Sequence, residues 1–198
     1  VYNLAMEHFY TMRENYFRST GNHHKDSAMK LVQQIMLLLR ISAAPDTVKE
    51  YQGEIPVKVL TAVEMTAGWE NEIVAIGVRH KVVLDSYVKA FKELLPDRPL
   101  FVCTGSTTSF AKRRALKNKL KDSGNGILLC TQQSLPSSVN FEFVNKVLIP
   151  ELHYNNSGMS QFYMRFVRYT STELKYIFFL AGLLLNAGIL EKRCSQSI

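Results

Sequence analysis

The sequence has few cysteines and no long apolar segment. Its three cysteines, Cys103, Cys130 and Cys194, form no Cys-x-x-Cys pair among 198 residues, which predicts reduced core thiols of a cytoplasmic protein. The longest apolar run, residues 177–190, holds about 14 residues including Asn186. A membrane-spanning helix needs roughly 20. We therefore expect no membrane partner and interpret this run as a buried strand passing into a packed helix.

The chain also lacks an initiator Met, a leader of charged then apolar residues, and any low-complexity window. These absences favour a globular fragment of a longer chain over a secreted or disordered protein. What it has in excess is positive charge, with 24 Lys and Arg against 17 Asp and Glu and a net charge of +7. Such an excess is compatible with a polyanionic partner.

Several catalytic signatures are missing as well. There is no Gly-x-x-x-x-Gly-Lys-Ser/Thr loop and no acidic pair at a strand end for magnesium, so the chain alone cannot cradle ATP as a P-loop protein does. A Gly-x-Ser-x-Gly elbow and a His-Glu-x-x-His helix are absent too. His23 and His24 are adjacent in sequence and have no ligand set around them, which predicts a loop and no metal. We interpret His8, His80 and His153 as satisfied polar groups.

The pattern of apolar residues divides the chain into a helical part and an alternating part. Residues 1–70 predict three helices: one with a loose helical period up to Tyr16, one capped at Asp26 or Ser27 that stops at Ala44, and one between Pro56 and Gly68. From residue 72, strands at 73–78, 100–103, 127–130 and 144–149 alternate with helical segments. Alternation of this kind predicts an α/β fold with a parallel sheet flanked by helices.

A small-residue turn and a basic helix follow the strand at 100–103. The turn is Gly105-Ser106-Thr107-Thr108, and its amides and hydroxyls can hold a phosphate of a nucleic-acid backbone. The alternative is an ordinary turn with Ser109 as helix cap. The helix has a narrow apolar stripe of Ala115, Leu116 and Leu120 and six positive charges: Lys112, Arg113, Arg114, Lys117, Lys119 and Lys121. The charges are either a solvated face or phosphate contacts without sequence specificity.

Near the end of the chain, Gln161, Arg165 and Arg168 are spaced i, i+4, i+7 and share one face of a predicted helix. Phe162, Phe166 and Tyr169 repeat that spacing one position later. Such a helix can bury its aromatic stripe and direct two guanidinium groups at a polyphosphate. The alternative is an amphipathic helix with solvated or salt-bridged arginines.

Taken together, these segments resemble the second motor lobe of superfamily-two helicases, most closely the Swi/Snf-type DNA translocases. The resemblance rests on the strand at 127–130, the loop ending in Val139-Asn140-Phe141, the strand at 144–149, Pro150-Glu151-x-x-Tyr154-Asn155-Asn156, and Gln161-x-x-x-Arg165-x-x-Arg168. It implies a RecA-like lobe without a P-loop over residues 71–180, a helical lead-in over 1–70 and a C-terminal helix or tail over 181–198. A helicase-like lobe of this kind is expected to be inactive alone.

The resemblance also implies roles for residues. Arg165 and Arg168 would be arginine fingers for ATP and Mg²⁺ held mainly by an N-terminal motor lobe of the same parent chain, with Gln161 ordering the interface and Asn140 near the nucleotide. Double-stranded DNA would meet residues 105–108, the basic helix from Lys112 to Arg114, and the pair Thr131 and Gln132.

Two departures from the family pattern keep other functions open. Pro136-Ser137-Ser138 stands where the family has a glycine-rich turn, and Thr170-Ser171 replaces its Gly-Gln, which suggests a divergent branch from phage or mobile elements. One alternative is a non-motor module of the same fold that docks nucleic acid or protein. The other is an unrelated α/β transferase whose basic face binds an anionic substrate.

Overall fold

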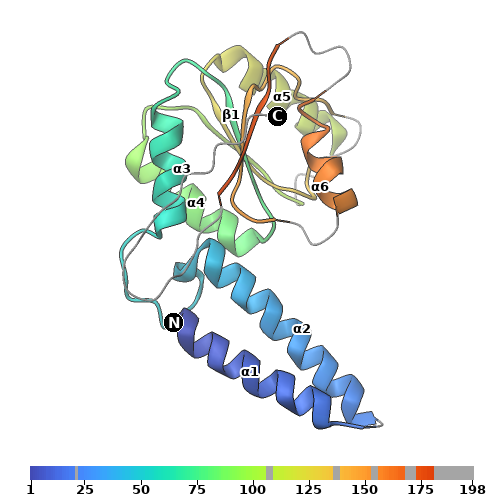
Figure 1. The fold of residues 1–198 in the computed structure, drawn as a ribbon. Coiled ribbons are helices and arrows are strands. Elements are labelled where there is room, and N and C mark those ends of the chain that lie inside the picture. The colour runs from blue at the N-terminus through green and yellow to red at the C-terminus, as the bar shows by residue number, and fades with distance from the viewer. Residues whose placement is uncertain (21, 106–108, 136–138, 153–155, 168–172, 181–198) are drawn as a thin grey trace. The chain divides into compact units, whose positions relative to one another are not determined.

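The computed structural model describes residues 1–198 except 21, 106–108, 136–138, 153–155, 168–172 and 181–198 (Figure 1). Arg168, Cys194 and His153, as well as most of the Gly-Ser-Thr turn and the Pro136-Ser137-Ser138 turn, therefore lie outside the described residues. The chain forms two compact units, Val1–Pro56 and a second that begins at Val57. The division thus falls before the third helix, whereas the sequence placed that helix in the lead-in segment.

The first unit is a pair of helices followed by a short 3-10 turn. Helix α1 spans Tyr2–Arg18, α2 spans Asn22–Ala43 and η1 spans Pro45–Thr47. Ala5, Leu38 and Ile41 form its small buried cluster, and the buried Gln34 Nε2 donates to the carbonyl oxygen of Ala5 at 2.8 Å. The two helices are therefore joined by apolar packing and by one buried hydrogen bond.

Helix α2 begins before the residues that we expected to cap it, so the prediction of a loop at His23 and His24 is wrong. Both histidines lie in the first turns of α2. The ring of His24 packs at a tilt of 31° against Tyr16 of α1 with centroids 4.3 Å apart, and its Nδ1 lies 3.3 Å from Ser19 Oγ. Contacts across the helix junction thus extend α2 through a stretch that local sequence would break.

The second unit contains a five-stranded parallel sheet. Its strands are β1 (Val74–Val78), β2 (Leu100–Cys103), β3 (Ile127–Thr131), β4 (Lys146–Ile149) and β5 (Tyr176–Phe179), in the order β2-β3-β1-β4-β5. Each neighbouring pair is parallel. The carboxyl ends of all the strands therefore lie at one edge of the sheet, as the predicted α/β fold requires.

Helices cover both faces of this sheet (Figure 1). Helices α3 (Val57–Ala67) and α4 (Lys81–Leu94) pack on one face, and α5 (Phe110–Ser123) and α6 (Asn156–Tyr163) on the other. The α5 and α6 side holds a continuous core that includes Leu120, Phe162 and Phe166. The central strands β1 and β3 are buried on both faces, which explains their unbroken apolar sequences.

The ends of several elements agree with local signals, and one burial prediction does not. Helix α3 begins directly after Pro56 and ends directly before Gly68, and α5 ends at Gly124, whose φ of 71° is the left-handed conformation that glycine favours. Strand β5, however, is an edge strand with Tyr176 and Phe179 exposed. The predicted burial of this strand is therefore wrong, because apolar sequence cannot distinguish an edge strand from a central one.

Candidate functional site

A cavity of about 190 Å³ opens at the carboxyl edge of the sheet. The turn that follows β3 and the region of α6 supply its walls, which are formed by Gln132, Gln133, Leu135, Gly158, Gln161 and Arg165. Three glutamine side chains and one guanidinium make the lining mostly polar. The structure thus brings together Gln132, Gln161 and Arg165, which the sequence had assigned to two different ligands.

Helix α6 places Gln161 at this cavity because its aromatic residues are buried on the opposite side. Phe162 and Phe166 are 1% and 0% exposed, and their rings meet edge to face at 5.3 Å. Gln161 is exposed and its Nε2 lies 3.5 Å from Ser157 Oγ, one turn earlier. The predicted division into an aromatic side and a polar side is confirmed for these residues.

The prediction that one regular helix carries Gln161 and Arg165 is wrong. Helix α6 ends at Tyr163, and Arg165 lies in the turn that follows, where its amide donates to Phe162 O at 3.1 Å. This three-residue hydrogen bond tightens the chain at the helix end. Both side chains still line the same cavity, because the turn continues the winding of the helix.

The main chain of Arg165 is fixed to the loop that precedes β4. The amide of Phe141 donates to the carbonyl oxygen of Arg165 at 2.8 Å, and the Phe141 and Phe166 rings lie 6.2 Å apart in the core. This bond places Asn140, the residue before Phe141, next to the segment of Arg165. Asn140 is half-buried and is not among the cavity-lining residues, so its role in binding the nucleotide stays a prediction.

Gln132 is buried at the base of the cavity wall, with 6% of its surface exposed. Its main-chain N–H donates to Val78 O at 2.8 Å, and its side-chain Nε2 donates to Gly77 O at 3.1 Å and Glu151 O at 2.7 Å. Its Nε2 is therefore engaged by the ends of β1 and β4. Thr131, the last residue of β3, is half-buried, and its carbonyl oxygen accepts from Ser134 N at 2.8 Å.

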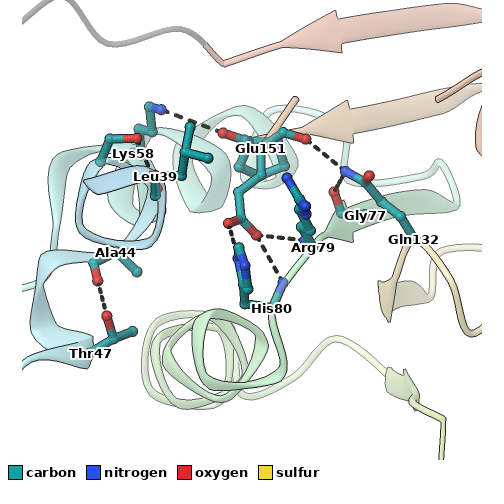
Figure 2. A network of polar contacts seen from close by, with 11 residues as sticks. Leu39, Ala44, Thr47, Lys58, Gly77, Arg79, His80, Gln132 and Glu151 are labelled. Atoms are coloured by element: carbon teal, nitrogen blue, oxygen red, sulfur yellow. Dashed lines mark hydrogen bonds and ion pairs between the residues drawn. The ribbon is translucent and has the colours of Figure 1, made fainter. Parts of the chain in front are cut away.

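Figure 2 shows a buried polar network behind Gln132 that the sequence did not reveal. The carboxylate of Glu151 accepts hydrogen bonds from Arg79 N at 2.5 Å, His80 N at 3.2 Å and His80 Nδ1 at 2.7 Å. The Nδ1 of His80 is thus bonded as expected, whereas its buried Nε2 has no hydrogen-bond partner among the described residues. His80 is also the N-cap residue of α4. The one available signal was an acidic residue two positions after the apolar strand at 144–149.

Lys58 approaches the same network from α3. Its Nζ donates to Pro150 O at 3.4 Å. Burial lowers the pKa of Lys58, and the negative charge of Glu151 acts in the opposite direction. The buried carboxylate is thereby accompanied by a positive charge as well as by hydrogen-bond donors, which a buried charge requires.

Of the predicted nucleic-acid residues that the structure describes, Gln132 lines the cavity. Ser134 Oγ donates to the carbonyl oxygen of Cys103 at 2.8 Å, so the turn after β3 is tied to the end of β2. Gly105 follows two residues later and is exposed. The remaining residues of this predicted turn, Ser106, Thr107 and Thr108, are outside the described part of the chain.

Helix α5 presents most of its charge to solvent. Lys112, Arg114, Lys119 and Lys121 are exposed, while Arg113 and Lys117 are half-buried. Leu120 and Leu116 face the core as predicted, but Ala115 is exposed, so the buried stripe is narrower than expected. Ser109 is the N-cap residue and makes no side-chain capping bond, so its side chain does not cap the helix.

The two described thiols are free, and burial keeps them protonated. Cys103 and Cys130 pair in register on adjacent strands. Burial raises the pKa of Cys103 and raises that of Cys130 far above its usual value. Both are therefore protonated core residues and poor nucleophiles at neutral pH. Within the described residues, no group of His, Cys, Asp and Glu could hold a metal ion, and no helix could cross a membrane.

No family model and no curated protein matches the chain. Among solved structures it is similar to the C-terminal part of the Fun30 ATPase domain, with 19% identity, a TM-score of 0.52 and coverage of 82% of this chain and 54% of that chain. It is also similar to the SWI2/SNF2 ATPase core of Sulfolobus solfataricus in complex with dsDNA, with 14% identity, a TM-score of 0.64 and coverage of 91% and 38%. A third similar structure is a Sulfolobus solfataricus SWI2/SNF2 ATPase C-terminal domain, with 15% identity and a TM-score of 0.54. The match covers 75% of this chain and 67% of that chain.

The chain has the fold of the C-terminal lobe of a Swi/Snf-type ATPase. This finding confirms the predicted RecA-like α/β lobe with its parallel sheet between two layers of helices. The chain spans about half the length of the matched Fun30 structure and 38% of the Sulfolobus core. A Swi/Snf-type core therefore contains a large part that this sequence does not include.

Proposed function

We propose that this chain is the C-terminal motor lobe of an ATP-dependent translocase on double-stranded DNA. One observation carries the proposal: Gln161 and Arg165 line a polar cavity with Gln132 at the carboxyl edge of a Swi/Snf-type lobe. In open α/β sheets, ligands bind outside the carboxyl ends of the strands. The cavity therefore lies where such a sheet binds a ligand, and its polar lining suits a polar ligand.

The dimensions of the cavity support half of a nucleotide site. Its volume of about 190 Å³ is below the roughly 300–1,000 Å³ of most small-molecule pockets. Its walls include a guanidinium that can meet phosphate oxygens, and the described residues include no cluster that could hold Mg²⁺. A second lobe would hold ATP and Mg²⁺, and this chain would complete the site from one side.

Arg165 is the residue that we assign to phosphate contact. The side chain is half-buried in a polar wall, where its charge acts more strongly than in bulk water. Its planar fork can contact two phosphate oxygens and offset the charge that develops on them during transfer. Arg168 is assigned the same role from the resemblance, with Gln161 ordering the interface and Asn140 near the nucleotide.

Helix α5 and the turn at Gly105 are assigned to the DNA backbone. The second unit carries 18 of the 24 basic residues and 11 of the 17 acidic ones, so the whole excess of positive charge belongs to it. Exposed lysine and arginine on α5 can neutralise phosphates without reading bases. The Sulfolobus structure holds double-stranded DNA, which makes duplex DNA the partner that we propose here.

ATP bound between the lobes would supply the phosphoryl group, and its hydrolysis would open and close them. Closure would bring Arg165 to the phosphates, and opening would release that contact. The bond between Ser134 and Cys103 ties the turn after β3 to the end of β2, which leads towards α5. Movement of the lobe would therefore move the DNA contacts of α5 together with the cavity. The cycle would thereby move the protein along the duplex.

The test is DNA-stimulated ATP hydrolysis by the full-length protein with Arg165→Ala and Arg165→Lys. We expect kcat to fall about a thousandfold for the alanine variant while nucleotide binding is retained, as for loss of an arginine finger. Lysine keeps the charge but not the fork, so it should restore only a small part of the rate. Arg18→Ala, at an exposed arginine on α1, is the matched control and should leave kcat unchanged.

The competing function is a docking module of the same fold without motor activity. Unchanged turnover in the Arg165 variants, or no DNA-stimulated turnover in the wild type, would establish that reading. The thermal unfolding midpoint of each variant should be measured alongside, because a folded but inactive Arg165 variant is the required result for the motor.

A further inference from the structure

We propose that Glu151 is a positioning residue for the cavity, and that it acts through Gln132. The inference rests on the proposed function, because it assigns Glu151 a part in the same reaction. Glu151 itself is not among the cavity-lining residues. Its effect must therefore pass through residues that are.

The carboxylate of Glu151 joins the ends of two neighbouring strands. Glu151 is 6% exposed and follows β4 by two positions. Oε2 accepts from Arg79 N and His80 N, and Oε1 lies 2.7 Å from His80 Nδ1 (Figure 2). These donors belong to the residues between β1 and α4. The side chain thus fixes the end of β4 to the end of β1.

The main chain of Glu151 is bonded directly to the cavity wall. The main-chain carbonyl of Glu151 accepts the bond from Gln132 Nε2 at 2.7 Å, and the same nitrogen donates to Gly77 O at 3.1 Å. Gln132 can make both bonds only while the ends of β1 and β4 keep their spacing. The carboxylate of Glu151 holds that spacing, so it controls where the wall residue Gln132 lies.

The donors around Glu151 require a carboxylate at this position. Two oxygens receive three donors, and all of the donors are main-chain amides or the ring nitrogen of His80. An amide side chain has one acceptor oxygen and would turn an NH₂ group toward one set of these donors. It would also leave Lys58, which interacts electrostatically with Glu151, without its negative neighbour. Glu151→Gln is therefore nearly isosteric and still disrupts the network.

A second hub in the same unit offers a matched control at the opposite edge of the sheet. Arg98 Nη2 donates to Glu72 O at 2.8 Å and Asn125 O at 2.7 Å, and Nη1 donates to Thr66 O at 2.5 Å. These carbonyls precede β1 and β3 or lie near the end of α3. Arg98→Lys would loosen a comparable set of loops, but at the amino ends of the strands and away from the cavity.

The experiment measures kcat and KM for DNA-stimulated ATP hydrolysis by the full-length protein, together with the unfolding midpoint. We expect Glu151→Gln to lower kcat on the order of 10- to 100-fold with little change in KM, because a displacement near 1 Å costs about that much. Arg98→Lys should leave kcat within about twofold at a similar loss of midpoint. Gln132→Met should reproduce the fall in kcat. The double variant Glu151→Gln/Gln132→Met should be little slower than either single variant, because the two substitutions disturb the same contact.

Hydrogen exchange on the same proteins separates this inference from the motor function. Glu151→Gln should raise exchange at the amides of Gln132 and Ser134, which donate to Val78 O and Thr131 O, whereas Arg98→Lys should not. An inactive wild type would overturn the proposed function, and raised exchange would still establish the positioning role. Equal losses of kcat in the Glu151 and Arg98 variants, or unchanged exchange at Gln132 and Ser134, would overturn the role of Glu151.

Discussion

At the scale of single residues, the contact between Gly77 and Phe162 joins the sheet to α6. A Cβ placed on Gly77 would lie 2.1 Å from Phe162 Cζ, so the ring occupies the space that any other residue would need. We expect Gly77→Ala to lower the free energy of unfolding by about 1–3 kcal/mol, the usual cost of overpacking. Because α6 leads to Arg165, the variant should also lower DNA-stimulated turnover. Urea unfolding and the ATPase rate would measure both effects.

Gly105→Ala is the matched control, because nothing lies within 4 Å of a Cβ at that position. Its stability should stay within about 0.5 kcal/mol of the wild type. In a Phe162→Leu background the extra methyl group of Gly77→Ala should cost less, since the aromatic ring that it meets is gone. Strictly additive effects of the two substitutions would contradict the contact as the cause.

The residues of the cavity differ in how far sequence could predict them. Gln161 and Arg165 were accessible because a spacing of four residues brings side chains together in a helix and in the turn that continues it. Glu151 and His80 are 71 positions apart in sequence, and only the pairing of β1 with β4 brings them together. Local pattern carries no information on such a contact, so the network behind Gln132 was missed.

At the scale of elements, α5 is expected to set the salt dependence of DNA binding. Replacing its exposed residues Lys112, Arg114, Lys119 and Lys121 with glutamine removes four positive charges. If each contacts a phosphate, the slope of log affinity against log salt should become shallower by about one per residue. Binding of a duplex measured between about 50 and 200 mM salt would give this slope.

A matched set of charges on the first unit controls for net charge alone. Arg13, Arg18, Lys25 and Lys30 are also exposed and number four, and they lie on α1 and α2. Their replacement with glutamine lowers the total charge by the same amount, yet it should change the slope much less. Equal slopes for the two variants would show that overall charge, and not α5, attracts the duplex.

The limits of elements were predicted well where two signals coincide. Strand β3 was found to within one residue because an apolar run ends at a polar turn, and α3 because Pro56 and Gly68 bracket it. The start of α2 and the end of α6 were wrong, because contacts of His24 with α1 and a tight turn before Arg165 decide them. Both are tertiary or geometric effects that residue preferences do not contain.

At the scale of the whole molecule, the two units have different charge. The first, Val1–Pro56, contains six basic and six acidic residues and is neutral, while the second carries the entire net charge of +7. Helix α3 belongs to the basic unit, although its helical pattern had placed it in the predicted lead-in segment. We therefore expect a polyanion to be attracted to the second unit and not to the first.

The buried thiols predict how the stability of the folded chain depends on alkaline pH. Burial raises the pKa of Cys103 and Cys130, whereas unfolded thiols ionise near pH 8.5. Their contribution to stability is therefore complete below about pH 8.5 and is lost as pH rises toward the folded-state pKa values, by up to roughly 1.4 kcal/mol per pH unit and thiol. Burial lowers the pKa of Lys58 and Lys175, so these lysines add stability as pH rises through their folded-state pKa values.

Urea unfolding from pH 7.5 to 9.5 measures the balance of these effects. The free energy of unfolding should fall less steeply with pH in Cys130→Ala than in the wild type, because the lysines are common to both proteins. Parallel curves would contradict the thiols as the source of the fall.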